Sequence, residues 1–182
     1  DFEATSFPYL ETKRLLLRDA TIEDAEAVFT VFSDSKVTQF HDMDTLTRID
    51  DAIKVIERRK QGFEGGRGIR WGITRKDDNY IIGSCGFTWI QELNAAEVGY
   101  ELASRFWLQG IMSEALNAIF KYGFESKGLE LIIAEIMLEN MTSRKLLHKL
   151  GFRSQEVLKK QGFWKGKYHD LERFILTKNE FF

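Results

Sequence analysis

Proline, cysteine and long apolar runs are scarce in this sequence. Pro8 is the only proline among 182 residues, and Cys85 is the only cysteine. A single cysteine excludes an internal disulfide and a multi-cysteine zinc site, and it favours a reducing, cytoplasmic location. No apolar run approaches the roughly 20 residues that a membrane-spanning helix needs, so we expect no membrane partner. We also expect no metal cofactor.

An excess of charge of one sign is also missing. Lys and Arg number 26 against 28 Asp and Glu, so the formal net charge is -2 at pH 7. This balance provides no basic surface of the kind that binds nucleic acid. The hydrophobic fraction of 43% and the charged fraction of 30% are typical of a globular protein. Because no linker or repeat divides the chain, we expect a single domain over residues 1–182, with a core at about 10–176.

Periodic patterns along the chain predict a mixed α/β (α+β) fold. Helices are expected at residues 22–33, from 46 to the glycine cluster at 62–68, at 111–126 and at 140–150. Strands are expected at residues 14–18, 69–74, 80–90, 96–103, 131–137, 152–160 and 168–176. The strand, loop, helix and strand of residues 96–137 form a crossover unit, which should place its two strands parallel and adjacent. We therefore expect a mostly antiparallel sheet of seven strands flanked by about four helices.

The segment Trp107–Ala115 contains Gly110 and leads from a strand into a helix. The first N–H groups of a helix lack internal partners and carry the positive end of its dipole, so they attract anions such as phosphate. A single glycine is a weak signal, and neither a Walker motif nor a dinucleotide-binding fingerprint is present. By itself the segment is more simply an ordinary helix start.

Asn140 and Ser143 follow the apolar strand predicted at residues 131–137. They therefore lie at the carboxyl end of a parallel strand, which is where open α/β sheets bind ligands. Asn140 equally fits the cap of the helix that follows, and Gly151 fits its end.

Five segments support a family resemblance through both their residues and their order. They are Thr12–Arg18, Glu97–Leu102, Trp107–Ala115, Glu139–Ser143 and Lys149–Phe152. Together they resemble the GNAT superfamily of N-acetyltransferases, and most closely its ribosomal-protein N-terminal (alanine/serine) acetyltransferase branch. The likeness extends from about residue 10 to residue 176. It implies a GNAT-like fold with a splayed central parallel strand pair, which a bulge before the glycine loop would separate.

The resemblance also implies where acetyl-CoA, the expected cosubstrate, is bound. Backbone N–H groups of the glycine loop would hold its pyrophosphate, and the pantetheine arm would pair with the freed strand edge at Tyr100 and Leu102. Asn140 would bond either to the same arm or to a bridging water. An N–H of that strand would polarise the thioester carbonyl. Met112 stands where the family has a small residue. The loop positions that match the family are Leu108, Gln109, Gly110, Ile111, Met112 and Ser113.

The implied reaction is direct attack of an amine on the acetyl thioester in a ternary complex. Glu135 matches the base of a related N-terminal acetyltransferase, and Glu101 and Glu97 are competing candidates. Each of these acids also fits an ordinary solvated strand residue. Many relatives carry an acid tyrosine at the position of Leu147, so that route is closed here. Ser143 matches a serine near the thioester sulfur and is predicted to orient or protonate the departing thiolate.

The acceptor pocket is expected between the first two helices and the last hairpin, lined by Phe40, Trp89 and Tyr168. Trp164 and His169 are further candidates there, whereas His41 and His148 lie in polar stretches and should be solvated. An α-amino group, with an ordinary pKa of roughly 7.7–8.0, needs less help from a base than lysine.

Several alternatives stay open. The amine acceptor is either a peptide N-terminus or a small molecule such as a polyamine, an amino acid or an antibiotic. The protein is either a monomer or a homodimer. The rival functions are a catalytically idle acyl-CoA-binding or regulatory module, an unrelated phosphate-ligand domain, and a dimerising structural domain with no CoA site.

Overall fold

The structure is a computed structural model and describes residues 6–182, with residues 1–5 of the expected domain outside this range. Six α-helices and three short 3-10 turns, at Ile22–Asp24, Gln91–Leu93 and Ser104–Phe106, accompany eight strands in the described chain. The helices are α1 Ala25–Phe32, α2 Ser35–Thr38, α3 Ile49–Glu64, α4 Ile111–Glu125, α5 Met141–Lys149 and α6 Lys178–Phe181. The strands are β1 Leu10–Glu11, β2 Leu15–Arg18, β3 Gly68–Arg75, β4 Asp78–Ile90, β5 Ala95–Leu102, β6 Leu131–Met137, β7 Arg153–Trp164 and β8 Lys167–Thr177.

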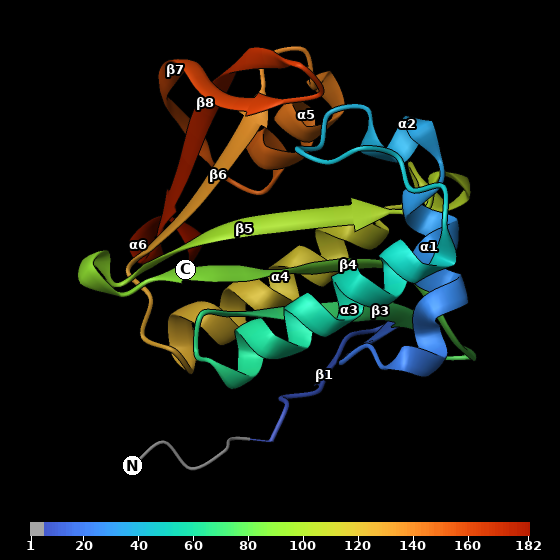
Figure 1. Ribbon diagram of the computed structural model, residues 1–182. Coiled ribbons are helices and arrows are strands. Elements are labelled where there is room, and N and C mark those ends of the chain that lie inside the picture. The colour runs from blue at the N-terminus through green and yellow to red at the C-terminus, as the bar shows by residue number, and fades with distance from the viewer. Residues whose placement is uncertain (1–5) are drawn as a thin grey trace.

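The strands form one open sheet in the order β1-β2-β3-β4-β5-β6-β8-β7. Only β5 and β6 pair in parallel within the described chain, and every other pair is antiparallel. Helices α1 and α3 cover one face of the sheet and α4 covers the other (Figure 1). Between the sheet and α4 lies the larger apolar core, which contains the fully buried Trp71, Ile119 and Phe120.

The predicted α/β fold with a splayed parallel pair is confirmed, while the element counts differ from the expectation. The additional strand is the two-residue β1, which pairs with β2. The two additional helices, α2 and α6, have four residues each. Elements this short have too few residues for a hydrophobic period to be recognised in the sequence. Among the described residues, no helix has both the length and the apolar character needed to cross a membrane.

Strands β5 and β6 separate after only three paired positions, from Ala95↔Leu131 to Glu97↔Ile133. The expected bulge in β5 is absent, because its ladder with β4 continues without a register shift as far as Leu102. The strands separate instead because β6 turns away with β8, to which it stays paired up to Met137 (Figure 1). A gap therefore opens between the carboxyl-terminal halves of the two parallel strands.

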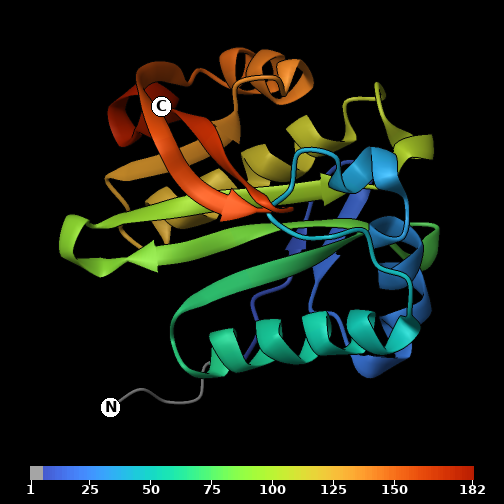
Figure 2. The ribbon, with the colours of Figure 1, turned by 45° about the horizontal axis from the view of Figure 1, so that its top comes forward.

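The β7–β8 hairpin reaches across this gap towards the amino-terminal part of the chain (Figure 2). At its tip, the Lys165 ammonium donates a hydrogen bond to the carbonyl oxygen of Thr38 over 2.6 Å. Thr38 ends α2, so the hairpin and the segment after α2 meet over the open side of the gap. This contact encloses the space in which the candidate site lies.

Candidate active site

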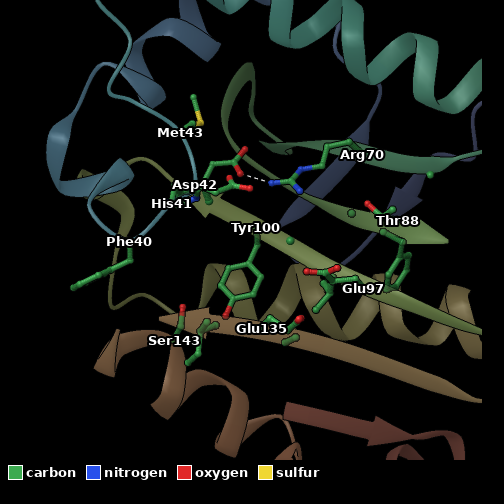
Figure 3. A pocket seen from close by; sticks show the side chains of 18 of the residues that line it. Phe40, His41, Asp42, Met43, Arg70, Thr88, Glu97, Tyr100, Glu135 and Ser143 are labelled. Carbon is green, nitrogen blue, oxygen red and sulfur yellow. Dashed lines mark hydrogen bonds and ion pairs between the residues drawn. The ribbon is translucent and has the colours of Figure 1, made fainter. Parts of the chain in front are cut away.

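A cavity of about 710 Å³ lies at the gap between β5 and β6. Its walls come from the segment after α2, from α3, from strands β3 to β6, from the start of α5 and from the last hairpin. Ten of the lining residues are labelled in Figure 3: Phe40, His41, Asp42, Met43, Arg70, Thr88, Glu97, Tyr100, Glu135 and Ser143. The predicted residues Phe40, Glu101, Glu135, Tyr100, Asn140 and Ser143 all line this one cavity.

Glu97 and Glu135 form a pair of acids at the point where the strands separate. Glu97 lies opposite Ile133 in the parallel ladder, and Glu135 is two residues beyond Ile133. Side chains alternate along a strand, so both carboxylates leave the sheet on the same face. Burial raises the pKa of Glu97, and the negative charges of Glu135 and Asp42 raise it further. A carboxylate with a raised pKa is better suited to accept a proton near neutral pH.

Glu101 is held differently, and the structure argues against its predicted role as a base. Its side chain is 2% exposed, it is paired with Arg59 and Arg70, and it accepts a hydrogen bond from Ser84. Burial by itself raises the pKa of Glu101, but Arg70 and Arg59 outweigh burial and lower it to about 2. At neutral pH this carboxylate stays ionised and binds no proton. Glu101 therefore anchors two arginines in the cavity wall, a role that the sequence pattern did not indicate.

The edge of β5 that faces the gap offers free backbone groups. The Ala103 N–H donates to the Ile82 carbonyl oxygen on β4 over 2.8 Å. Backbone groups alternate sides along a strand, so the N–H groups of Val98, Tyr100 and Leu102 point away from β4 and towards the gap. These are the positions at which β6 has already departed. A ligand with an extended, amide-containing chain can pair with this edge.

The loop after β5 leads from this edge to the start of α4. Leu108 has a φ of 61° and Gly110 a φ of 73°, so the loop turns through the left-handed region at both residues. No side chain caps the amino terminus of α4. Arg14 holds the loop from outside through hydrogen bonds to the Gln109 carbonyl oxygen, at 3.0 Å, and to the Glu114 carboxylate, at 2.7 Å. The N–H groups of this helix start thus form the kind of site that binds phosphate.

The loop side chains themselves point in different directions. Leu108 is 99% exposed, whereas Ile111 and Met112 are buried in the core beneath the helix. Met112 is 8% exposed, so its side chain belongs to the core. Any role of Ile111 and Met112 in holding a ligand therefore falls to their backbone N–H groups.

Helix α5 places Asn140 and Ser143 at the opposite side of the gap. The Asn140 side-chain oxygen accepts a hydrogen bond from the Ser143 N–H over 3.1 Å, so Asn140 is the helix cap. Tyr100 reaches from β5 towards Ser143 (Figure 3). Tyr100 leaves the strand on the face opposite Glu97, since the two residues differ in parity. Acids and hydroxyl groups thus approach the gap from the two faces of the sheet.

Several buried polar atoms of the cavity have no hydrogen-bond partner. In residues 6–182 five side-chain atoms are buried and unpaired, and His41 Nδ1, Tyr100 Oη and Trp164 Nε1 belong to residues that line the cavity. Buried polar groups are almost always paired in folded proteins, so these three atoms mark the cavity as a place with hydrogen-bonding capacity to spare. The expectation that His41 is solvated is wrong, because its segment folds back over the gap. His148 is exposed, as predicted.

Two of the three predicted acceptor-binding residues lie outside the cavity. Trp89 packs on Phe87, with the ring centroids 5.5 Å apart, near the far end of β4. Tyr168 is 63% exposed at the hairpin tip, where it packs edge-on against Phe163. Their positions follow from strand pairing, which the sequence pattern alone did not define. Arg59, Arg70 and Asp42 were not predicted, although a charged residue within an alternating strand, as at Arg70, is a usable signal.

Within residues 6–182, the structure gathers no group of three or more His, Cys, Asp and Glu side chains suited to holding a metal ion. Cys85 lies on β4 with its side chain buried in the core, and burial raises the pKa of its thiol to about 12. A thiol that stays protonated is a poor nucleophile.

Comparison with known proteins places this geometry in a family. The sequence matches the acetyltransferase (GNAT) domain over residues 14–153. It is 38% identical over 173 residues to the uncharacterized N-acetyltransferase YoaA of Bacillus subtilis, covering 94% of this chain and 98% of that protein. It is 28% identical over 114 residues to the ribosomal protein uS5-alanine N-acetyltransferase of Escherichia coli, covering 62% of this chain and 59% of that protein.

Solved structures share the fold. A GNAT-family acetyltransferase from Bacillus anthracis superposes with a TM-score of 0.84 at 24% identity, covering 94% of this chain and 99% of that one. The ribosomal-protein acetyltransferase RimL, solved in complex with coenzyme A, superposes with a TM-score of 0.82 at 20% identity, covering 93% and 98%. The matched domain, the N-acetyltransferase relatives and the separated parallel strands agree, and the chain belongs to the GNAT family of acetyltransferases.

Proposed function

We propose that this enzyme transfers the acetyl group of acetyl-CoA to a primary amine by direct attack in a ternary complex. The observation that carries the proposal is the gap between β5 and β6, with free backbone groups along one edge, carboxylates on one face and hydroxyls on the other. Such a gap accommodates a thioester between a proton acceptor and a group that stabilises the departing sulfur.

The residues around the gap fit acetyl-CoA as cosubstrate. The unpaired N–H groups at the start of α4, with the loop residues Leu108 to Ser113, suit the pyrophosphate. The free N–H groups of Tyr100 and Leu102, together with Asn140, suit the amide-containing pantetheine arm. An N–H of the same edge would polarise the thioester carbonyl. The RimL structure with coenzyme A supports this assignment by likeness of fold.

Glu135 and Glu97 act together as the base in this proposal. Both carboxylates line the cavity, and the raised pKa of Glu97 reflects burial and the charge of Glu135. The amine loses its proton to this pair, and its lone pair then attacks the carbonyl carbon. The C–N bond forms while the C–S bond breaks, with the electron pair leaving on the sulfur. Ser143, across the gap, donates a hydrogen bond to the departing thiolate.

The acceptor we favour is the α-amino group of a protein or peptide N-terminus. The indole N–H of Trp164, buried at the cavity without a partner, can only donate, so it suits a carbonyl oxygen next to the amine. A peptide N-terminus has such a carbonyl, and a polyamine has none. The relationship to the uS5-alanine acetyltransferase agrees with this choice. A small-molecule amine is the alternative acceptor.

The first test is thermal denaturation with acetyl-CoA, desulfo-CoA and ATP. Acetyl-CoA and desulfo-CoA at about 100 times the dissociation constant should each raise the melting temperature by about 5–10 °C. ATP should have no comparable effect, because it lacks the pantetheine arm. If neither CoA compound stabilises the protein, the assignment of the cosubstrate is overturned.

The second test is a turnover assay on matched acceptors. A short peptide with a free N-terminus is compared with the same peptide after N-terminal blocking, and with spermidine, by thiol release and mass spectrometry. Acetylation of the free peptide alone supports the proposal, and acetylation of spermidine alone supports the small-molecule alternative. Binding of acetyl-CoA without turnover of any amine would identify an idle module.

A further inference from the structure

Tyr100 carries the least explained group of the site. Its hydroxyl oxygen is fully buried and has no hydrogen-bond partner. It points across the gap towards Ser143 on α5 (Figure 3). The α5 position from which a tyrosine could approach the thiolate is Leu147, which is buried in the core. Tyr100 brings a phenol to the same gap from the opposite strand.

The placement of Tyr100 follows from the fold. Beyond Glu97, β6 no longer occupies the space beside β5, so a large side chain on this part of β5 extends into the gap. The ring of Tyr100 packs against the main core and holds the hydroxyl in place. Burial raises the pKa of Tyr100 to about 12, against a smaller lowering by the nearby Ser143 hydroxyl. The phenol therefore keeps its proton and acts as a hydrogen-bond donor.

Ser143 needs such a donor. Its backbone N–H is fixed by the Asn140 side chain, and its hydroxyl lies close enough to the Tyr100 hydroxyl to affect the pKa of the phenol. A free hydroxyl rotates among several directions, of which only one meets the sulfur. A donor on one lone pair of the Ser143 oxygen would turn the Ser143 proton away from that donor and into the gap.

We propose that Tyr100 is a positioning residue that donates a hydrogen bond to Ser143 Oγ and thereby directs the Ser143 hydroxyl onto the departing sulfur. This inference rests on the proposed function. Tyr100 and Ser143 both keep their protons throughout: the sulfur leaves with the electron pair of the C–S bond, and the thiolate later takes a proton from water. The amine proton goes to the Glu97 and Glu135 pair.

The first test uses Tyr100→Phe, which keeps the ring and removes the hydroxyl. We expect kcat to fall about tenfold, the effect of one lost hydrogen bond, with KM for acetyl-CoA changed less than about twofold. The melting temperature should change little, because the variant keeps the ring that packs against the core. In a Ser143→Ala background, Tyr100→Phe should have no further effect on kcat. Tyr122→Phe, on α4 against Trp71, is the matched control.

The second test needs no acceptor. At about pH 9.5, above the ordinary pKa of a thiol, CoA carries a thiolate that desulfo-CoA lacks. The affinity for CoA, relative to the affinity for desulfo-CoA, should fall about tenfold in both Tyr100→Phe and Ser143→Ala. It should stay unchanged in Tyr122→Phe. An unchanged ratio in Tyr100→Phe, or additive losses of kcat in the double variant, overturns the inference. If the unmodified protein does not bind CoA, the proposed function itself is overturned.

Discussion

Glu97, at the last paired position of β5 and β6, and Glu135, two residues further along β6, leave the sheet on the same face. Each lies within the electrostatic reach of the other, and Glu135 raises the pKa of Glu97. Arg173, 3.6 Å from Glu135, partly offsets this repulsion. A carboxylate whose pKa is raised in this way can take up a proton near the reacting amine.

The acid limb of the pH profile tests this pair. Protonation of the pair abolishes the base, so kcat/KM should rise with pH through a pKa above the ordinary glutamate value. Replacing Glu135 with Gln removes one charge and lowers the pKa of Glu97. The acid limb should therefore move to lower pH, by about half a unit to one unit, while kcat falls. Kinetics from pH 4.5 to 9 measure both effects.

Glu97→Gln removes the carboxylate with the raised pKa, so the acid limb that it produces should disappear and kcat should fall by about a hundredfold. Glu156→Gln is the matched control, since Glu156 also pairs with Arg173 but does not line the cavity. If the acid limb of the pH profile is unchanged in both Glu97→Gln and Glu135→Gln, these two carboxylates do not act as the base.

Glu101→Gln tests the anchoring of the two arginines. Removing one partner of a buried ion pair leaves uncompensated charge, so we expect a loss of about 3 kcal/mol in the free energy of unfolding at pH 7. The pKa of Glu101 is lowered to about 2 in the folded state. Its contribution is therefore fully present above about pH 4.5, the unfolded value, and is lost as the pH falls towards 2. Urea unfolding at several pH values measures the difference.

The exposed Glu92→Gln, which removes the same charge from a surface turn, is the control for this experiment. The difference in the free energy of unfolding between the unmodified protein and Glu101→Gln should decrease as the pH falls from 5 to 2. A difference that stays constant over this pH range would mean that the carboxylate charge does not stabilise the fold.

Met112→Ala addresses the departure from the family pattern at the helix start. The side chain is buried beneath α4, so truncation should cost about 2–4 kcal/mol of stability. The affinity for acetyl-CoA should change less than about twofold at a temperature where the variant is folded, because the side chain is buried in the core. Calorimetry measures both quantities, with the exposed Met141→Ala as control. A large gain in affinity would show that Met112 obstructs the site.

Arg14→Gln tests the support of the loop before α4. Arg14 binds both the Gln109 carbonyl and the Glu114 carboxylate, so its loss should loosen the loop and weaken acetyl-CoA binding about threefold to tenfold. Lys13→Gln makes the same change of charge one residue away, at an exposed side chain, and should leave the affinity unchanged. If both variants weaken acetyl-CoA binding equally, the removed positive charge explains the effect and the contacts of Arg14 to the loop do not.

Trp164→Phe tests the recognition of the acceptor. The variant keeps an aromatic ring to stack on His169 but removes the unpaired indole N–H. We expect kcat/KM for a peptide with a free N-terminus to fall about fivefold to tenfold, with KM for acetyl-CoA unchanged. Trp89→Phe, outside the cavity, is the matched control. A normal rate with Trp164→Phe would exclude the indole N–H from acceptor binding.

Local signals in the sequence predicted most elements correctly. The alternation in residues 69–103 marked the antiparallel meander, and Asn140 proved to be the cap of α5. These features depend on residues a few positions apart, whose spacing is visible in the sequence. The same reasoning placed Trp89 and Tyr168 in the acceptor pocket, where the structure does not have them. An aromatic residue in a strand or hairpin gives no signal of which cavity it faces.

The sequence by itself determined the order of strands and helices, the parallel crossover and the glycine-containing start of α4, because hydrophobic period and capping act over a few residues. Only the tertiary structure decided which acid is free to act. Arg59, Arg70 and Glu101 are far apart in the chain, and their meeting lowers one pKa while the Glu97 and Glu135 pair keeps another raised. The approach of Tyr100 to Ser143 likewise depends on the divergence of β6 from β5. Pairwise contacts of this kind arise from the packing of distant segments, which no local pattern encodes.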